Sequence, residues 1–347
     1  MKHLPFLLAF AATTASAQTP TSIEAVEWDP AGRWIVTNGS NMLQTADGGD
    51  TWTVFSDVGA THGMEVVDGH LFALDNGVLR AVDLASEGQT SSLTLPGTSF
   101  LNGMGSRSSE LIISDFGTGA LHRVDISNPA AMTSSVLVGD LGATPNGVVI
   151  DEANNRALVV TWGACKVFAV DLETAEVSTV VASTGLSNCD GIDLDGEGRA
   201  YVSSWSPNRI TRFSPDFSTS EAVVTSGLSS PADISYALES DVLAVANSGS
   251  DVVTFHPFGE SGVAELEGGD RFVPYSTGIW AEAAAGPWTV SGLDGAGRLL
   301  WETRVMLTDG YHSVELAESA GGQWAHTSLL VFSGPNTERT AIQLPPR

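Results

Sequence analysis

The chain has 347 residues, of which 15 are Lys or Arg and 41 are Asp or Glu, and its formal net charge is −26 at pH 7. Proteins that bind nucleic acids or anionic membrane surfaces concentrate Lys and Arg on their binding faces, so this balance argues against both classes. The acidic residues are dispersed along the chain, which favours a solvated surface, and the charge alone is weak grounds for cation binding.

The first residues have the pattern of a secretory signal peptide. Lys2 precedes an apolar stretch over residues 4–12, and Ala15-Ser16-Ala17 forms a small-residue cleavage site before Gln18. The stretch is too short to span a bilayer, and no other segment is expected to span one. We therefore predict that residues 1–17 are removed and that the protein is secreted or held at the cell surface. A buried N-terminal strand is the alternative.

A unit that recurs about every 40 residues organises residues 18–269. Its clearest copies are Asn146-Gly147-Val148-Val149-Ile150-Asp151 and Asp190-Gly191-Ile192-Asp193-Leu194-Asp195. Repeats of this period are typical of solenoids and propellers. With looser copies included, the unit starts at Glu24, His62, Asn102, Asn146, Asp190 and Ala232.

Each unit is predicted to contain four short β-strands separated by Gly, Asp, Asn and Ser. No long segment has helical periodicity with capping residues. The first strand opens the unit, and a short fourth run closes it. Second strands are expected at 34–38, 71–75, 111–115, 157–161, 200–204 and 242–247, and third strands at 42–45, 78–82, 121–124, 167–170, 210–213 and 252–255.

Four strands in each of six units predict an all-β fold, a six-bladed β-propeller over residues 18–269. Such a fold hides its sheet edges by radial repetition. A pair of β-sandwiches is the alternative, although neither sandwich needs a repeat in register.

Residues 270–347 break the repeat, and we predict that they form a small separate β-sandwich-like domain; a seventh blade is the alternative. The segment resembles the C-terminal sorting domain of type IX secretion substrates through Gly295-Ala296-Gly297-Arg298-Leu299-Leu300 and the Leu329-Leu330-Val331-Phe332 strand. Thr327-Ser328 stand where that family has a Gly-x-Tyr opening. The resemblance implies contact with secretion machinery. Strands are expected at 272–276, 288–291, 299–303, 312–316 and 328–332.

The two cysteines, Cys165 and Cys189, are expected to meet an oxidising environment after export. Cys165 lies between the second and third strands of unit four, and Cys189 lies just before the first strand of unit five. These loop types emerge on the same face of a propeller, so a disulfide is plausible. Two buried free thiols are the alternative.

The first strand of each blade lines the central channel, so the residues that open the six units are expected to converge at one channel mouth. Oxygen donors of mixed charge suit a hard divalent cation, and Ca²⁺ is the first candidate. The glycines after four of these residues allow close backbone packing or unusual dihedral angles; ordinary turn formation is the alternative.

Three of the residues that open the units resemble the metal-binding positions of the SMP-30/gluconolactonase (regucalcin-like) family. The resemblance rests on Glu24-Ala25-Val26-Glu27-Trp28, Pro145-Asn146-Gly147 and Cys189-Asp190-Gly191-Ile192-Asp193. It implies a six-bladed propeller with one divalent cation held by Glu24, Asn146 and Asp190, and hydrolysis of sugar lactones. The family's blade-three Arg-x-Asn-Asp-Gly segment is replaced by Ser99-Phe100-Leu101-Asn102-Gly103, so the sugar specificity is not expected to carry over.

The mechanism that the resemblance implies is metal-assisted hydrolysis of a lactone or related ester. Asp190, or another acid of the channel, is the expected proton acceptor, with His62 as an alternative base if its side chain points inward. His62 and Asn102 are expected to contact the substrate at the channel mouth. The alternative function is a non-catalytic exported propeller that binds a ligand or protein partner at the same face, and the absent arginine favours it.

Thr45-Ala46-Asp47-Gly48-Gly49-Asp50-Thr51-Trp52 fits the Asp-box of sialidase-like propellers. We expect Asp47 and Thr51 to fix a hairpin between the last two strands of a blade and Trp52 to pack between blades. This motif supports the fold and is silent about catalysis.

Overall fold

A computed structural model describes residues 16–258 and, beyond them, residues 271–274, 278–282, 286–293, 298–307, 311–316, 320, 323, 329–334 and 337–343. Most of the predicted signal peptide and the predicted boundary at 269/270 lie outside these residues, so both stay predictions. No helix of the described part is long and apolar enough to cross a membrane.

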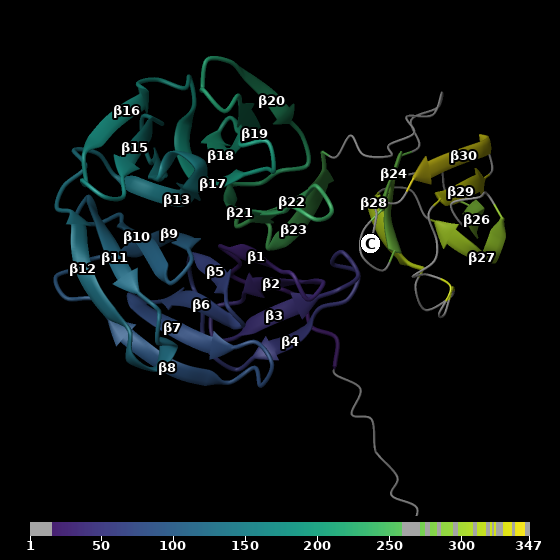
Figure 1. Ribbon diagram of the computed structural model, residues 1–347, viewed down its shortest axis with the longest axis horizontal. Helices are drawn as coiled ribbons and strands as arrows, with labels where there is room; N and C mark the ends of the chain where they lie inside the picture. The colour runs from purple at the N-terminus through teal and green to yellow at the C-terminus, as the bar shows by residue number, and fades with distance from the viewer. Residues whose placement is uncertain are drawn as a thin grey trace, which may run out of the picture.

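Six antiparallel sheets stand around a ring (Figure 1). The first four-stranded blades are β1 to β4 (Val26–Asp29, Arg33–Thr37, Met42–Thr45, Thr53–Ser56), β5 to β8 (Met64–Val67, His70–Asp75, Val78–Asp83, Gln89–Thr94) and β9 to β12 (Leu101–Arg107, Glu110–Asp115, Ala120–Asp125, Thr133–Val138). They are followed by β13 to β16 (Pro145–Asp151, Arg156–Thr161, Val167–Asp171, Val177–Val181), β17 to β20 (Ser187–Leu194, Ala200–Ser206, Asn208–Phe213, Ser220–Val224), and β21 to β23 (Pro231–Ala237, Val242–Asn247, Val252–Pro257).

The ring closes between blades six and one, and each blade shares an apolar core with its neighbours. The Asp233 N–H donates to the Glu24 carbonyl at 3.0 Å, and the Ile23 N–H donates to Asp251 Oδ1 at 3.1 Å. One core cluster combines Trp34 of blade one with Phe255 of blade six. The six-bladed propeller is thus confirmed, and a pair of sandwiches is wrong.

The Asp-box builds the hairpin between β3 and β4. Thr45 Oγ1 donates to Asp47 Oδ1 at 2.5 Å, and the Thr51 N–H donates to the same oxygen at 2.9 Å. Gly48 and Gly49 have φ of 71° and 92°, which side-chain-bearing residues rarely adopt. Trp52 is buried in the core between blades one and six, so the motif joins the two blades where the ring closes.

The channel-lining strands carry a β-bulge near the start of the unit. In β9, β13, β17 and β21 the pairing with the second strand slips by one residue, for example between Pro145 and Val148. A bulge of this kind re-aims the side chains beside it. In these four blades the repeated motif therefore marks the point at which the inner strand bends at the channel.

Cys165 and Cys189 form a disulfide with a Cα–Cα distance of 5.4 Å. The β14–β15 loop also reaches the start of β17 through the Ala164–Ser187 bridge. The cross-link therefore joins blades four and five on the face where the first strands begin.

The C-terminal residues form two further sheets with their own core, so a seventh blade is wrong. One sheet has the order β24-β25-β28 (Arg271–Pro274, Gly278–Glu282, Tyr311–Glu315), and the other β27-β26-β29-β30 (Leu299–Leu307, Gly286–Leu293, Leu329–Gly334, Thr337–Gln343). Ile279 of the first sheet packs with Trp288 and Phe332 of the second. The β-sandwich-like prediction is confirmed; β25 was not among the predicted strands.

Candidate functional site

Asn146 and Asp190 lie buried at the start of neighbouring inner strands, with exposed fractions of 1% and 4%. Asn146 Nδ2 donates to the Cys189 carbonyl at 3.3 Å, which turns Oδ1 away from that contact. Asn146 Oδ1 is buried and has no hydrogen-bond partner among the residues that the structure describes. A buried acceptor without a partner costs about 1–3 kcal/mol, so this oxygen is a candidate ligand atom.

Glu24 completes this group from blade one. Burial raises the pKa of Glu24 to about 7, against a hydrogen bond from Ser248 that lowers it. Burial, and then the negative charges of Glu24 and Asp233, raise the pKa of Asp190 well above its usual range, while Asn146 and Trp205 lower it. Glu24 and Asp190 therefore interact through their charges, with Asn146 beside Asp190. We call Glu24, Asn146 and Asp190 the mouth triad.

The mouth triad fits a hard cation by its chemistry. Two carboxylates and one carboxamide offer oxygen donors alone, which is the ligand type that Ca²⁺ prefers. Within the described residues no three His, Cys, Asp or Glu side chains form a metal-binding group. A cation site at the mouth triad would therefore depend on Asn146. Its Oδ1 would be the third oxygen ligand, beside the two carboxylates of Glu24 and Asp190.

The other three residues that open the units have different surroundings. The ring of His62 packs edge-on against Phe100 at a centroid distance of 4.8 Å, its Nδ1 lies 2.9 Å from Thr61 Oγ1, and burial lowers its pKa. Asn102 is buried, and its carbonyl accepts the Gly63 N–H at 2.9 Å. The Ala232 carbonyl accepts the Ser203 hydroxyl at 2.7 Å.

The glycines that follow four of these residues serve close packing between blades. None of Gly63, Gly103, Gly147 and Gly191 has a positive φ. A Cβ on Gly147 would lie 2.4 Å from the Asp190 carbonyl oxygen, and one on Gly103 would lie 2.2 Å from the Asn146 carbonyl oxygen. Of the explanations open at the sequence level, close backbone packing applies, and unusual dihedral angles do not.

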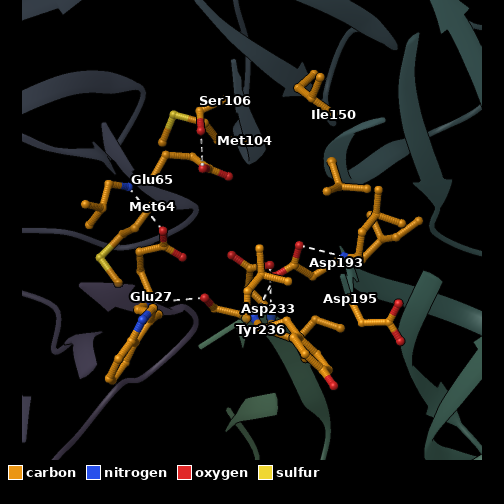
Figure 2. Close-up of a pocket in the computed structure, with 18 of the residues that line it drawn as sticks. Glu27, Met64, Glu65, Met104, Ser106, Ile150, Asp193, Asp195, Asp233 and Tyr236 are labelled. Atoms are coloured by element: carbon orange, nitrogen blue, oxygen red, sulfur yellow. Dashed lines mark hydrogen bonds between the residues drawn. The ribbon is translucent and has the colours of Figure 1, made fainter. Parts of the chain in front are cut away.

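A second set of acids, further along the inner strands, was missed by the sequence reasoning. Glu27, Glu65, Asp193 and Asp233 line a cavity of about 360 Å³, together with Ser106 and Ser235 (Figure 2). Pro30, Glu152 and Glu239 of the loops after the first strands also line this cavity, so it lies toward the end of the channel opposite the unit starts.

Burial is the main cause of high pKa values in this cavity. Burial, together with the negative charge of Asp193, raises the pKa of Glu27 to about 8 and that of Asp233 to about 8. Burial raises the pKa of Asp193 to about 7 and that of Glu65 well above its usual range. Of the described residues, no Lys, Arg or His lines the cavity.

Three of these side chains tie neighbouring blades together, which gives them a structural task. Glu27 Oε1 accepts the Val66 N–H at 3.1 Å, Asp193 Oδ2 accepts the Tyr236 N–H at 2.6 Å, and Glu65 Oε2 accepts the Ser106 hydroxyl at 2.7 Å. Glu27, Glu65 and Asp193 stand three residues after Glu24, His62 and Asp190, so the aligned repeat carried a usable signal. Asp233 occupies the position at which four units have glycine. An acidic residue at that position of the aligned repeat could have identified it as a channel residue.

Comparisons with known proteins bear on the fold alone. No family description and no curated protein matches the sequence. The fold is similar to a streptogramin B lyase (TM-score 0.53, 10% identity, 75% of this chain and 92% of that chain) and to virginiamycin B lyase from Staphylococcus aureus (0.52, 11%, 77% and 94%). It is also similar to the Cps50 (Swd1) β-propeller domain from Myceliophteria thermophila (0.53, 9%, 71% and 100%). These neighbours include two lyases and a β-propeller domain for which no activity is named, so the propeller is what they share.

Proposed function

We propose that this chain is a metal-dependent hydrolase that opens a lactone or related ester at the channel mouth. The observation that carries the proposal is the buried Asn146 Oδ1, which has no hydrogen-bond partner in the described part of the chain and stands beside Asp190. The resemblance of the triad positions to SMP-30/gluconolactonase proteins supports the same activity.

Glu24, Asn146 and Asp190 would hold the cation, and Ca²⁺ is the favoured ion. A divalent cation in such a site supplies Lewis acidity toward a carbonyl oxygen and lowers the pKa of water. Asp190 would accept the proton of the attacking water at its carboxylate. His62 is the less favoured base, because its Nδ1 already faces Thr61 and burial lowers its pKa.

The test of the metal site is thermal unfolding with Ca²⁺ and with a chelator. We expect Ca²⁺ to raise the melting temperature of the wild type, since a ligand at 100 times its Kd adds about 2.7 kcal/mol to the free energy of unfolding. Asn146→Ala and Asp190→Asn should lose this shift, whereas Glu173→Gln, which neutralises an exposed loop carboxylate, should keep it. A wild-type melting temperature that is the same with Ca²⁺ and with the chelator would contradict the proposed metal site.

The hydrolytic activity needs its own test, with lactones and esters assayed in Ca²⁺. Turnover by the wild type above that of Asp190→Asn would support the hydrolase. If Ca²⁺ binds and no turnover appears, the second candidate applies, a non-catalytic propeller that binds a ligand or protein at this face. The observation that favours the second candidate is Ser99-Phe100-Leu101 in place of the sugar-contacting arginine segment.

We also propose that the protein is exported, with residues 1–17 as its signal peptide and the C-terminal β-sandwich as a sorting domain for secretion machinery. The A-x-A site before Gln18 supports the first part and Gly297-Arg298-Leu299 the second. Mass spectrometry of the protein outside producing cells should find Gln18 as the first residue. Chains that still carry Met1 would contradict the signal peptide.

A further inference from the structure

Five aromatic rings form a continuous arc on the face where the first strands begin. His62 contacts Phe100, Phe100 contacts Phe116, Phe116 contacts Trp162, and Trp162 contacts Trp205. The successive centroid distances are 4.8, 5.5, 6.1 and 5.0 Å, within the range of favourable ring pairs. The arc spans blades two to five.

Three rings of the arc occupy the same position in consecutive blades. The Phe116 N–H donates to the Phe100 carbonyl, and the Trp162 N–H donates to the Thr144 carbonyl. Each of these two carbonyls belongs to the residue that stands two positions before the residue that opens its unit. Trp205 has the corresponding place in blade five, because Ser204 pairs with Cys189 and Ser206 with Ser187. The second strands of blades three to five thus each have an aromatic residue at or directly after their end, at the channel mouth.

The same position is polar in blade six. The Ser248 N–H donates to the Ser230 carbonyl, which matches the bonds of Phe116 and Trp162. The Ser248 hydroxyl donates to the same carbonyl at 3.1 Å. A hydrogen bond from Ser248 also lowers the pKa of Glu24. In blade one, Gly39 follows β2 at this place. The mouth therefore has an aromatic side on blades two to five and a small, polar side on blades six and one.

The arc reaches the mouth triad at Trp205, because the neighbouring Ser204 pairs with Cys189, the residue directly before Asp190. Phe100, at the other side of the arc, is 40% exposed. All five rings are at least partly accessible to solvent. A group bound against the triad would thus have an aromatic wall beside it.

Few polar groups of the arc are free to receive a hydroxyl-rich ligand. Phe100 and Phe116 have no polar side-chain atom, and His62 Nδ1 faces Thr61. A sugar lactone placed against this wall would leave hydroxyl groups without partners, and each such loss is unfavourable. A flat apolar ring would bury its face against Phe116 and Trp162 with no such penalty.

We infer that the substrate is a lactone or ester whose reacting carbonyl is joined to a flat, apolar ring, and that the arc of His62, Phe100, Phe116, Trp162 and Trp205 binds that ring. This inference rests on the proposed hydrolase for its reacting group, and the arc itself determines the specificity. The ring lies against blades three to five, and the carbonyl points to the mouth triad.

The binding test compares coumarin with 2-pyranone, which is the same unsaturated lactone without the fused benzene ring, by calorimetry on the full chain in Ca²⁺. We expect coumarin to bind at least 10-fold more tightly. Trp162→Ala and Phe116→Ala should each weaken coumarin about 3- to 10-fold, the value of one lost aromatic contact, and Trp162→Phe should restore part of it. Phe217→Ala, which truncates a half-buried ring in the β19–β20 loop, is the matched control and should bind as the wild type does.

A turnover assay separates this inference from the proposed function. Dihydrocoumarin should be hydrolysed with a lower KM than δ-valerolactone, and Trp162→Ala should raise KM more than it lowers kcat. If gluconolactone or δ-valerolactone is hydrolysed equally well and Trp162→Ala changes nothing, the hydrolase stands and the arc inference fails. If coumarin binds through Trp162 without any hydrolysis, the arc stands and the hydrolase fails. Equal binding of coumarin and 2-pyranone to the wild type overturns the inference.

Discussion

At the scale of single residues, the glycines of the repeat set how closely the inner strands approach one another. The Ser114 hydroxyl accepts the Gly103 N–H at 2.8 Å and donates to the Asn146 carbonyl of the next blade at 2.6 Å. Ser203 makes the matching pair of bonds with Gly191 and Ala232. A side chain at either glycine would enter the space where the neighbouring backbone lies.

Gly147→Ala should therefore destabilise the propeller strongly. The added Cβ would lie 2.4 Å from the Asp190 carbonyl oxygen and 2.9 Å from the Gly191 Cα, neither of which can rotate away. We expect the free energy of unfolding to fall by about 3 kcal/mol, the upper range for overpacking. Urea unfolding measures it, with Gly139→Ala as control because no atom lies within 4 Å of its new Cβ. Equal stability of the two variants would contradict the packing role.

The sequence predicted part of the site because the repeat is visible in single residues. Asn146 and Asp190 stand at matching places, and one alignment puts both at the channel. Phe116 and Trp162 escaped notice because they follow the second strands, in loops where no apolar residue is needed for a core. Asp233 escaped notice because an acid there breaks the glycine pattern on which the alignment relied.

At the scale of elements, Asp115 holds two loops of blade three in place. Its Oδ1 accepts the N–H groups of Phe100 and Gly117 at 2.9 and 3.0 Å, and its Oδ2 accepts that of Ser99 at 2.9 Å. Burial pushes the pKa of this carboxyl up, but the hydrogen bonds from Phe100, Thr118 and Ser99 outweigh it and leave the pKa below its ordinary value. The end of β10 is thereby tied to the start of β9, with Phe100 and Phe116 between them.

Asp115→Asn should destabilise blade three and loosen the aromatic arc. The amide keeps one acceptor oxygen but turns an NH₂ group toward backbone donors, which leaves buried N–H groups without a partner. We expect a loss of about 1–3 kcal/mol in the free energy of unfolding. Asp125→Asn is the control, because Asp125 is exposed at the end of the next strand. Thermal unfolding of both variants tests this, and a loss no larger than that of Asp125→Asn would count against the clamp.

At the scale of the whole molecule, the basic residues lie apart from the acidic residues of the channel. Several arginines pair with acids at the turns after the first and second strands, as in Arg33–Asp29, Arg156–Asp151 and Arg199–Asp195. Among the ion pairs of the described residues, none involves Glu24, Glu27, Glu65, Asp190, Asp193 or Asp233. Six carboxyl groups thus share one channel without a basic partner, and they must bind protons or a cation to remain there.

The stability of the protein should therefore fall as pH rises through the neutral range when a chelator is present. The pKa of Glu27 is about 8 and that of Asp233 about 8 in the folded state, against 4.5 and 3.8 ordinarily, so the folded protein binds more protons than the unfolded chain between these values. Stability is full below about pH 4 and is lost toward pH 8, at up to about 1.4 kcal/mol per pH unit for each group.

Burial lowers the pKa of His62, His122 and His256, which acts in the opposite direction below pH 6.5. Urea unfolding between about pH 7 and 8, where the histidines of the unfolded chain have lost most of their protons, therefore reports chiefly on the carboxyl groups. Glu27→Gln keeps the acceptor for the Val66 N–H and removes the titrating group, so its slope in this window should be shallower than that of the wild type. A wild-type stability that rises with pH there, or an identical slope in Glu27→Gln, would show that Glu27 is already ionised in the fold.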